Sequence, residues 1–148
     1  MTPSESRPIV CATRGGQASR RTQERAIALS QERGAPLIFL FATDPSFAGL
    51  QDGTMQAALT DELLRMGHSL LCIAEARAEK QGQEAQKAVK CGAAWEIIEE
   101  YLQQVNANTL VIGMPQSDAA LQASEPGEVH RFAEKLRQTT DIEVIVVE

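Results

Sequence analysis

The chain has 148 residues, of which 43% are hydrophobic and 23% are charged, and this composition is typical of an ordinary globular protein. Its 20 acidic and 14 basic residues give a net charge of −6, which disfavours a general nucleic-acid or anionic-membrane surface because affinity for phosphate comes mainly from Lys and Arg. No apolar run approaches the roughly 20 residues that cross a bilayer, and the polar segment 1–7 has no signal-peptide core, so we expect a cytoplasmic protein without membrane or nucleic-acid partners.

The length predicts a single domain over residues 1–148, with enough chain to bury a core. Residues 8–13 read as a first strand, and their continuous apolar run indicates cover on both faces. A helix is predicted at 18–33, with Ser19 as its N-cap and Gly34 at the C′ position.

The second predicted strand, residues 37–43, is another buried apolar run. Asp44 and Pro45 end it, because proline cannot continue a hydrogen-bonded ladder. Residues 46–54 are predicted to form a loop, and a long helix follows at 55–80. The apolar stripe of this helix has the spacing of an amphipathic helix lying on a sheet, with a short coiled-coil seam as the alternative. The stripe consists of Leu59, Leu63, Met66, Leu70 and Ile73.

Residues 84–91 are a weaker strand, and the lysines within it favour an exposed or edge position. Gly92 breaks this strand, and a helix is predicted at 93–105. A fourth strand at 109–113 is followed by a long loop at 114–127, a length that indicates function or disorder in a compact domain.

The last two predicted elements are a helix at 128–138 and an apolar strand at 142–147. Strands and helices therefore alternate from the first strand to the fifth. This order predicts an α/β fold, a three-layer α/β/α sandwich around a parallel sheet.

Two glycine-bearing turns follow the first and fourth predicted strands, in the runs 8–16 and 108–116. In an open parallel sheet, ligands bind beyond the carboxyl ends of the strands, where the strand order reverses. We therefore expect these two turns to be the walls of a single crevice.

Several features together resemble the universal stress protein family over nearly the whole chain. They are the strand and glycine turn at 8–16, the helix closing on Gly34, the strand ending at Asp44-Pro45, the Leu110-Val111-Ile112-Gly113 strand and the terminal Val144-Ile145-Val146-Val147 run. The resemblance implies a five-stranded parallel sheet in the order 3-2-1-4-5. It also implies a homodimer formed through the last strand, residues 142–147.

Some members of that family bind ATP, with an aspartate after the first strand and Gly-x2-Gly-x9-Gly-(Ser/Thr) after the fourth. This chain keeps glycine at Gly15 and Gly113 but departs from the pattern at Arg14, Gln116, Pro126 and Gly127. Gln116 carries a Cβ that disfavours positive φ, and Pro126 has no N–H to donate. The departures weaken the expectation of a triphosphate cradle.

Arginines surround the start of the first helix, at Arg20, Arg21 and in the turn 14–16. Together with the unpaired N–H groups of a helix N-terminus, they suit a small anion or a nucleotide phosphate. The alternative is a solvated turn whose arginines pair with Glu24 or other acids.

His130 and Arg131 begin the fourth predicted helix and either contact a ligand or lie exposed in its first turn, whereas His68 is interpreted as a structural or surface residue. The three cysteines, Cys11, Cys72 and Cys91, share no metal-ligand spacing and are interpreted as reduced structural thiols. Backbone groups of Ala42 or Thr43 are expected to meet a base, as the resemblance implies. The predicted ligand-binding residues are Ala12, Thr13, Arg14, Gly15, Gly16, Ala42, Thr43, Asp44, Gly113, Met114, Gln116, His130 and Arg131.

No nucleophile elbow, His-x-x-x-His pair or complete P-loop is present in the sequence, so no catalytic residue and no metal ligand is predicted. The preferred interpretation is a regulatory, non-catalytic module of the universal stress type that binds ATP, AMP or another small anion. The first alternative is a weak ATP-hydrolysing or phosphate-transferring enzyme of the adenine nucleotide hydrolase group, which would need a metal-binding carboxylate such as Asp44 or Asp118. The second is a ligand-free dimeric interaction domain.

Overall fold

Five parallel strands form one sheet in the order β3-β2-β1-β4-β5 in the computed structural model, which describes residues 7–13, 17–43, 53–113 and 126–147. The strands are β1 (Ile9–Ala12), β2 (Leu37–Thr43), β3 (Ala85–Cys91), β4 (Thr109–Gly113) and β5 (Glu143–Val147). This arrangement confirms the predicted fold class and strand order, including the edge position of β3.

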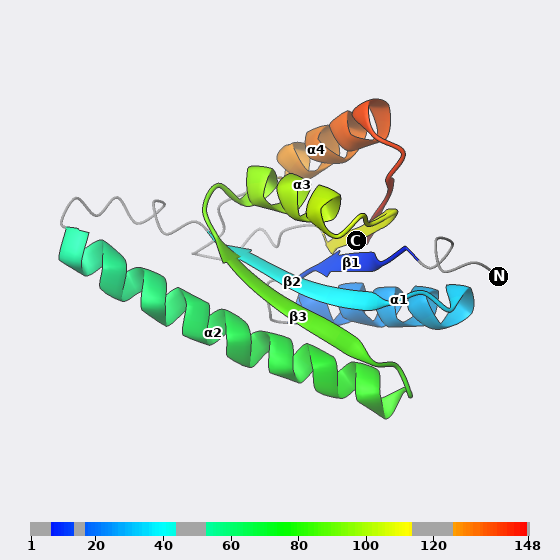
Figure 1. Cartoon of the computed structure of the whole chain (residues 1–148), viewed down its shortest axis with the longest axis horizontal. Coiled ribbons are helices and arrows are strands. Elements are labelled where there is room, and N and C mark those ends of the chain that lie inside the picture. The colour runs from blue at the N-terminus through cyan, green and yellow to red at the C-terminus, as the bar shows by residue number, and fades with distance from the viewer. Residues whose placement is uncertain (1–6, 14–16, 44–52, 114–125, 148) are drawn as a thin grey trace.

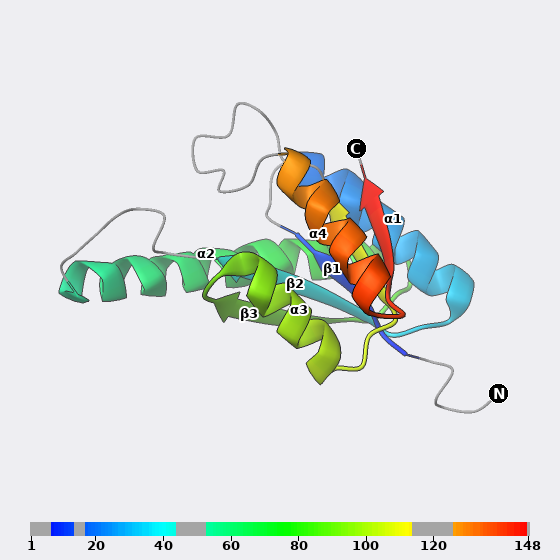
Figure 2. The same cartoon turned by 90° about the horizontal axis from the view of Figure 1, so that it is seen from above.

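Helices cover both faces of the sheet (Figure 1). The helices are α1 (Gln17–Arg33), α2 (Gly53–Lys80), α3 (Ala94–Gln104) and α4 (Pro126–Thr139). One face carries α1 and α2, and the other carries α3 and α4, which gives the three layers seen in Figure 1 and, from above, in Figure 2. None of the helices in the described ranges combines the length and the apolarity that a membrane span needs.

The central strand β1 supplies both layers of the core. Ile9 and Cys11 pack into the cluster beneath α1 and α2, whereas Val10 packs into the cluster beneath α3 and α4, and all three are fully buried. Burial raises the pKa of the Cys11 thiol, so this cysteine behaves as a small apolar residue, as expected. All three cysteines are free thiols, as expected, and Cys72 and Cys91 are exposed.

The ends of several helices differ from the sequence predictions. The first helix begins at Gln17, so Ser19 lies inside its first turn and is not the N-cap. Gly34 has a φ of 63° and follows the helix as predicted. The long helix begins at Gly53, which shortens the loop expected at 46–54, and the rest of that loop lies outside the described residues.

The fourth helix begins at Pro126, two residues before the predicted start. Proline suits the first helical position, because its missing N–H is one that a helix leaves unpaired there. The predicted loop at 114–127 therefore loses its last two residues to the helix, and the remainder lies outside the described residues.

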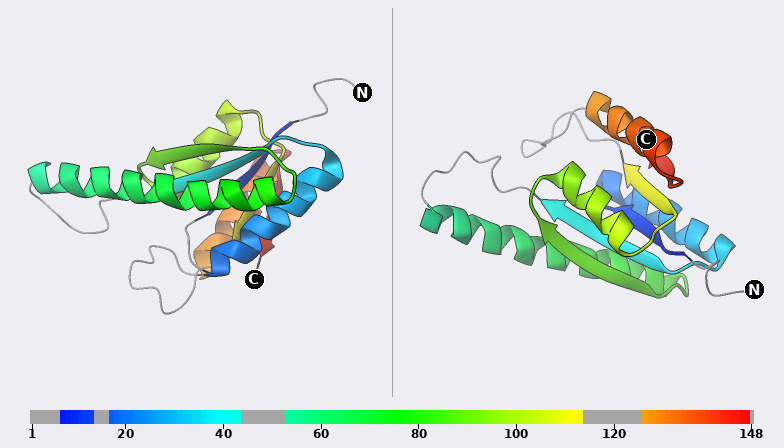
Figure 3. Two further views of the ribbon diagram at one scale, coloured as in Figure 1. Left: turned by 90° about the horizontal axis from the view of Figure 1, so that it is seen from below. Right: turned by 45° about the horizontal axis from the view of Figure 1, so that its top comes forward.

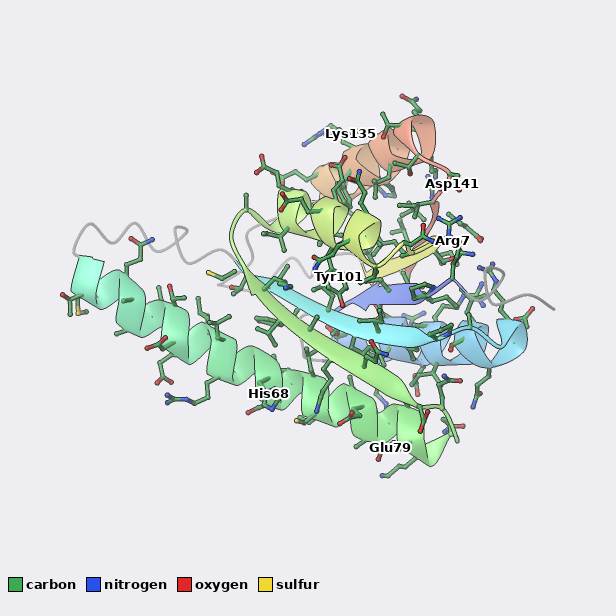
Figure 4. The ribbon with its side chains drawn as sticks, in the orientation of Figure 1. Arg7, His68, Glu79, Tyr101, Lys135 and Asp141 are labelled. Carbon is green, nitrogen blue, oxygen red and sulfur yellow. The ribbon has the colours of Figure 1, made fainter. Side chains whose placement is uncertain are left out.

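The amino-terminal end of the sheet is tied together by Arg7. Its guanidinium donates hydrogen bonds to the carbonyl oxygens of Asn106 and Ala107 and to the Asp141 carboxylate, at 3.0–3.1 Å. Figure 4 shows Arg7 and Asp141 on the same side of the molecule. The hydrogen bond from Arg7 holds the pKa of Asp141 below its ordinary value. One side chain thus links the turns that precede β4 and β5.

The buried face of α2 includes only part of the stripe predicted from the sequence: Leu63 is buried, and Leu59 and Leu70 are half-buried. The residues that it buries are Leu63, Gly67, Leu71, Ala74 and Ala78. Met66 and Ile73 belong to the predicted stripe but are 44% and 51% exposed. The reason is size: a Cβ on Gly67 would lie 2.4 Å from Cδ1 of Phe41, so this face lets the helix approach the sheet closely. The helix lies on the sheet, as favoured over a coiled coil, and its N-terminal part extends past the strands (Figure 1, Figure 3).

Gly67→Ala is predicted to destabilise the protein by about 1–2 kcal/mol, because forcing a Cβ against the Phe41 ring outweighs the gain of about 1 kcal/mol from replacing glycine in a helix. Chemical denaturation of the full chain measures this difference. Gly53→Ala is the matched control, since a Cβ there meets nothing within 4 Å. Equal stability of the two variants would contradict this account of α2 packing.

Candidate functional site

The carboxyl ends of β1 and β4 lie side by side. Ala12 pairs with Ile112 of β4 on one side and with Leu40 of β2 on the other, and the Thr13 N–H donates to the Leu40 carbonyl oxygen at 2.9 Å. After β1 the chain builds the sheet outward through β2 and β3, and it then returns to β4 on the opposite side of β1. The strand order therefore reverses between β1 and β4, which is where parallel sheets bind ligands.

Thr13 occupies this switch point and is 4% exposed. The side-chain amide of Gln23 on α1 donates to the Thr13 hydroxyl oxygen at 2.9 Å, and Arg77 on α2 donates to the Gln23 amide oxygen at 2.7 Å. The three side chains come from three elements, and this chain of hydrogen bonds holds the hydroxyl in a defined orientation. Gln23 and Arg77 were missed by the sequence predictions, because partners 10 and 54 residues away leave no local pattern.

Gly113 ends β4 beside the first helix. A Cβ at this position would lie 2.4 Å from the Thr22 hydroxyl oxygen, and Thr22 is itself 1% exposed. Gly113 is also not among the described glycines that have a positive φ. Glycine here therefore allows α1 to pack closely on β4, a structural role that is sufficient to explain the residue.

Two arginines lie near the start of α1. Arg20 and Arg21 are both exposed, and the Arg20 guanidinium lies 3.7 Å from the Glu24 carboxylate. The sequence offered pairing with Glu24 as the alternative to an anion site, and Arg20 makes this pair. Such an exposed ion pair is weak, so it leaves the guanidinium available to a stronger anionic partner.

His130 and Arg131 are exposed and lie in the second turn of α4, not at its start as predicted. The Arg131 guanidinium reaches back over the first turn, since a Cβ on Gly127 would lie 3.2 Å from its Nη1 atom. A cation is thereby held near the positive end of the helix dipole, where it gains nothing from the helix itself. The charge of Arg131 adds to the positive helix terminus, and Glu128 in the first turn offsets part of it.

The helices α1 and α4 both start at the carboxyl-terminal end of the sheet, one on each face (Figure 1, Figure 2). Their N-terminal N–H groups are directed toward that end. Two helix termini thus face the end of the sheet at which β1 and β4 stop, and exposed cations lie near the start of each helix. Helix N-termini and cations are groups that can bind an anion.

The end of β2 is less open than the sequence suggested. Ala42 and Thr43 are half-buried, and the Thr43 carbonyl oxygen already accepts a hydrogen bond from the Gly92 N–H at 2.8 Å. The turn after β3 therefore occupies one lone pair of the Thr43 carbonyl oxygen. A base that bonds to this oxygen would have to use its other lone pair.

Of the predicted binding residues, the structure brings one group to the carboxyl ends of the three central strands: Ala12, Thr13, Ala42, Thr43 and Gly113. A second group lies outside the described residues: Arg14, Gly15, Gly16, Asp44, Met114 and Gln116. Within the ranges that the structure describes, no group of three His, Cys, Asp or Glu side chains could hold a metal ion.

Comparison with known proteins gives a consistent family assignment. The family model for the universal stress protein family matches residues 5–148. No curated protein matches the chain in sequence.

Solved structures share the fold at low sequence identity. UspA from Lactobacillus plantarum is 15% identical, with 97% of this chain and 99% of that chain covered and a TM-score of 0.76. A universal stress protein in complex with cAMP is 21% identical, with 97% and 98% covered and a TM-score of 0.67. A universal stress protein from Archaeoglobus fulgidus in complex with dAMP is 18% identical, with 95% and 97% covered and a TM-score of 0.60.

Gly113→Ala is predicted to destabilise the protein by about 1 kcal/mol or more, because the new Cβ collides with the Thr22 hydroxyl. In the double variant Thr22→Ala/Gly113→Ala, the methyl has room, so its loss of stability should be smaller than the sum of the two single losses. Denaturation of all four proteins measures the coupling. Strict additivity would show that Gly113 has no packing role.

Proposed function

The chain belongs to the universal stress protein family, and on that premise we propose that it is a regulatory, non-catalytic module that binds an adenine nucleotide or another small anion. The proposed site is the crevice beyond β1 and β4. We also propose that this module acts in the stress response, in the cytoplasm.

The observation that carries the proposal is the pairing of Ala12 with Ile112. It places the two strand ends together at the point where strand order reverses, with the N-termini of α1 and α4 on either face. Exposed cations at Arg21 and Arg131 would meet a phosphate group that enters from this end.

The relatives support the choice of ligand. One related structure is a complex with cAMP and another is a complex with dAMP, and both ligands carry an adenine base and a single phosphate. The helix that follows β4 here starts with Pro126, which offers no N–H at its first position. A nucleoside monophosphate, which needs fewer donors than a triphosphate, is therefore the proposed ligand, with AMP favoured over ATP.

Titration calorimetry with AMP and cAMP, and with ATP in the presence and absence of Mg²⁺, tests this proposal. We expect saturable binding of a monophosphate and a weakening of about five- to tenfold in Arg131→Gln, the effect of losing one charge-assisted contact. Lys135→Gln, one turn further along α4, removes the same charge from an exposed side chain that pairs with Glu99 at 3.7 Å. Its affinity should match that of the unchanged chain.

Turnover is measured alongside binding. Binding without hydrolysis supports the regulatory module. ATP hydrolysis that disappears in Asp44→Ala would overturn the non-catalytic assignment and support the enzyme instead. A chain that binds none of these nucleotides, nor inorganic phosphate, would contradict the proposed site and leave the ligand-free interaction domain.

We also propose that the chain is a homodimer through β5. This strand lies at the edge of the sheet, and its sequence Glu143-Val144-Ile145-Val146-Val147 is apolar after the first residue. Among the described strands, none lies on the outer side of β5, and such an edge pairs readily with its own copy across a two-fold axis. The proposed interface begins at Glu143, since Ile142 lies before the strand and is 6% exposed.

Light scattering at micromolar concentration should give twice the mass of 16.1 kDa. Val147→Lys places a charge at the end of the edge strand and should shift the equilibrium toward the monomer. The opposite edge provides the control, because Gln86→Lys on β3 should leave the mass unchanged. A monomeric mass for the unchanged chain would rule out the dimer.

A further inference from the structure

Cys72 lies outside the crevice in a cluster of three ionisable side chains. It is exposed on α2, and its sulfur lies 3.8 Å from Nε2 of His68, one turn earlier on the same helix. The ammonium of Lys87, on the neighbouring strand β3, donates a hydrogen bond to the same sulfur at 3.7 Å. Figure 4 shows where His68 lies on α2. Two basic groups from two different elements therefore contact one accessible thiol.

The ammonium beside Cys72 is held in place by a fourth ionisable side chain, Glu75. Lys87 donates to the Glu75 carboxylate at 3.0 Å, and both side chains are about three-quarters buried. The hydrogen bond that Lys87 donates to Glu75 raises the pKa of Lys87, so this side chain stays charged at neutral pH. The cation is thus fixed between a carboxylate and a sulfur, on the α2 side of the sheet.

The other two thiols lack this environment. Cys11 is fully buried, and burial raises its pKa. Cys91 is exposed at the end of β3, but within the described part of the chain its sulfur makes no hydrogen bond and no contact with a cation. A thiolate is the nucleophilic form of cysteine, and a neighbouring cation stabilises it. Among the three thiols, Cys72 is the one that is both exposed and in contact with basic side chains in the described structure.

We propose that Cys72 is a modification site for thiol–disulfide exchange with a small, negatively charged disulfide. The Cys72 sulfur attacks one sulfur of the disulfide, a new S–S bond forms, and the original S–S bond breaks. The electron pair of the broken bond leaves on the released thiolate. The proton of the Cys72 thiol passes to Nε2 of His68 or to water, so Cys72 is oxidised to a mixed disulfide and the reagent is reduced to one free thiol.

Lys87 gives the site its preference for a negative reagent. Its ammonium lies beside the sulfur under attack and attracts an anionic disulfide as it approaches. A neutral disulfide gains nothing from this attraction. The preference for charge therefore separates the role of Lys87 from simple exposure of the sulfur, which would favour both reagents equally.

The test uses the full chain with glutathione disulfide as the anionic reagent and bis(2-hydroxyethyl) disulfide as the neutral one, and peptide mass spectrometry follows each cysteine. We expect Cys72 to react faster than Cys91 by about fivefold or more, with Cys11 unreactive in the folded protein. Lys87→Gln should slow the reaction of Cys72 with glutathione disulfide several-fold more than its reaction with the neutral reagent. His68→Gln should slow both reactions.

Lys90→Gln is the matched control. Lys90 is the other lysine of β3, but its ammonium lies 5.8 Å from the ring centre of Tyr101 on α3, on the opposite side of the sheet. Its removal should leave both rates at Cys72 unchanged. The unchanged chain provides a second readout if Lys87→Gln fails to fold. Raising the salt concentration to about 1 M should lower the rate at which Cys72 reacts with glutathione disulfide and leave its rate with the neutral reagent unchanged.

Equal rates at Cys72 and Cys91 would overturn the proposal. So would equal effects of Lys87→Gln and Lys90→Gln, or a rate with glutathione disulfide that does not respond to salt. None of these outcomes depends on nucleotide binding, because the cluster lies on α2 and β3 and not on β1 or β4.

Discussion

The position of β1 between β2 and β4 is the constraint on which the rest of the molecule depends. Ala12 has a hydrogen-bonded neighbour on each side, and the residues before it alternate between the two core clusters. Both layers of helices pack against this one strand, so its register sets the position of each layer relative to the other. The strand order around β1 places the ends of β1 and β4 side by side and creates the switch point. Fold and candidate site therefore have a single physical origin.

The candidate site combines the geometry of the fold with residues that serve packing. Gly113 is one of two glycines that the resemblance linked to nucleotide binding, yet its lack of a Cβ is already required by Thr22. Thr13 is oriented by Gln23 and, through it, by Arg77 of α2. In the proposed function, the groups offered to a ligand are therefore helix termini and exposed cations.

The close packing of α2 on the sheet also positions exposed side chains of this helix beside β3. Its small residues bring it near Phe41, and this approach places its outer residues beside the edge strand β3. Lys87 of that strand then reaches both Glu75 and Cys72. The thiol cluster is in this sense a consequence of the same packing that buries Gly67, and it is physically separate from the crevice.

The sequence by itself determined the order of elements, the parallel sheet and its edge strand, because apolar runs, glycines and prolines act locally and leave patterns a few residues long. Only the tertiary structure decided that Gly67, Ala74 and Ala78 belong to the buried face of α2, since glycine and alanine carry no hydrophobic signal until a neighbour such as Phe41 is in place. It likewise decided that Thr13 meets Gln23 and that Cys72 meets Lys87, because these partners lie on other elements and meet only after the sheet has formed. Contacts between distant residues depend on the register of the strands, and no local pattern in the chain encodes them.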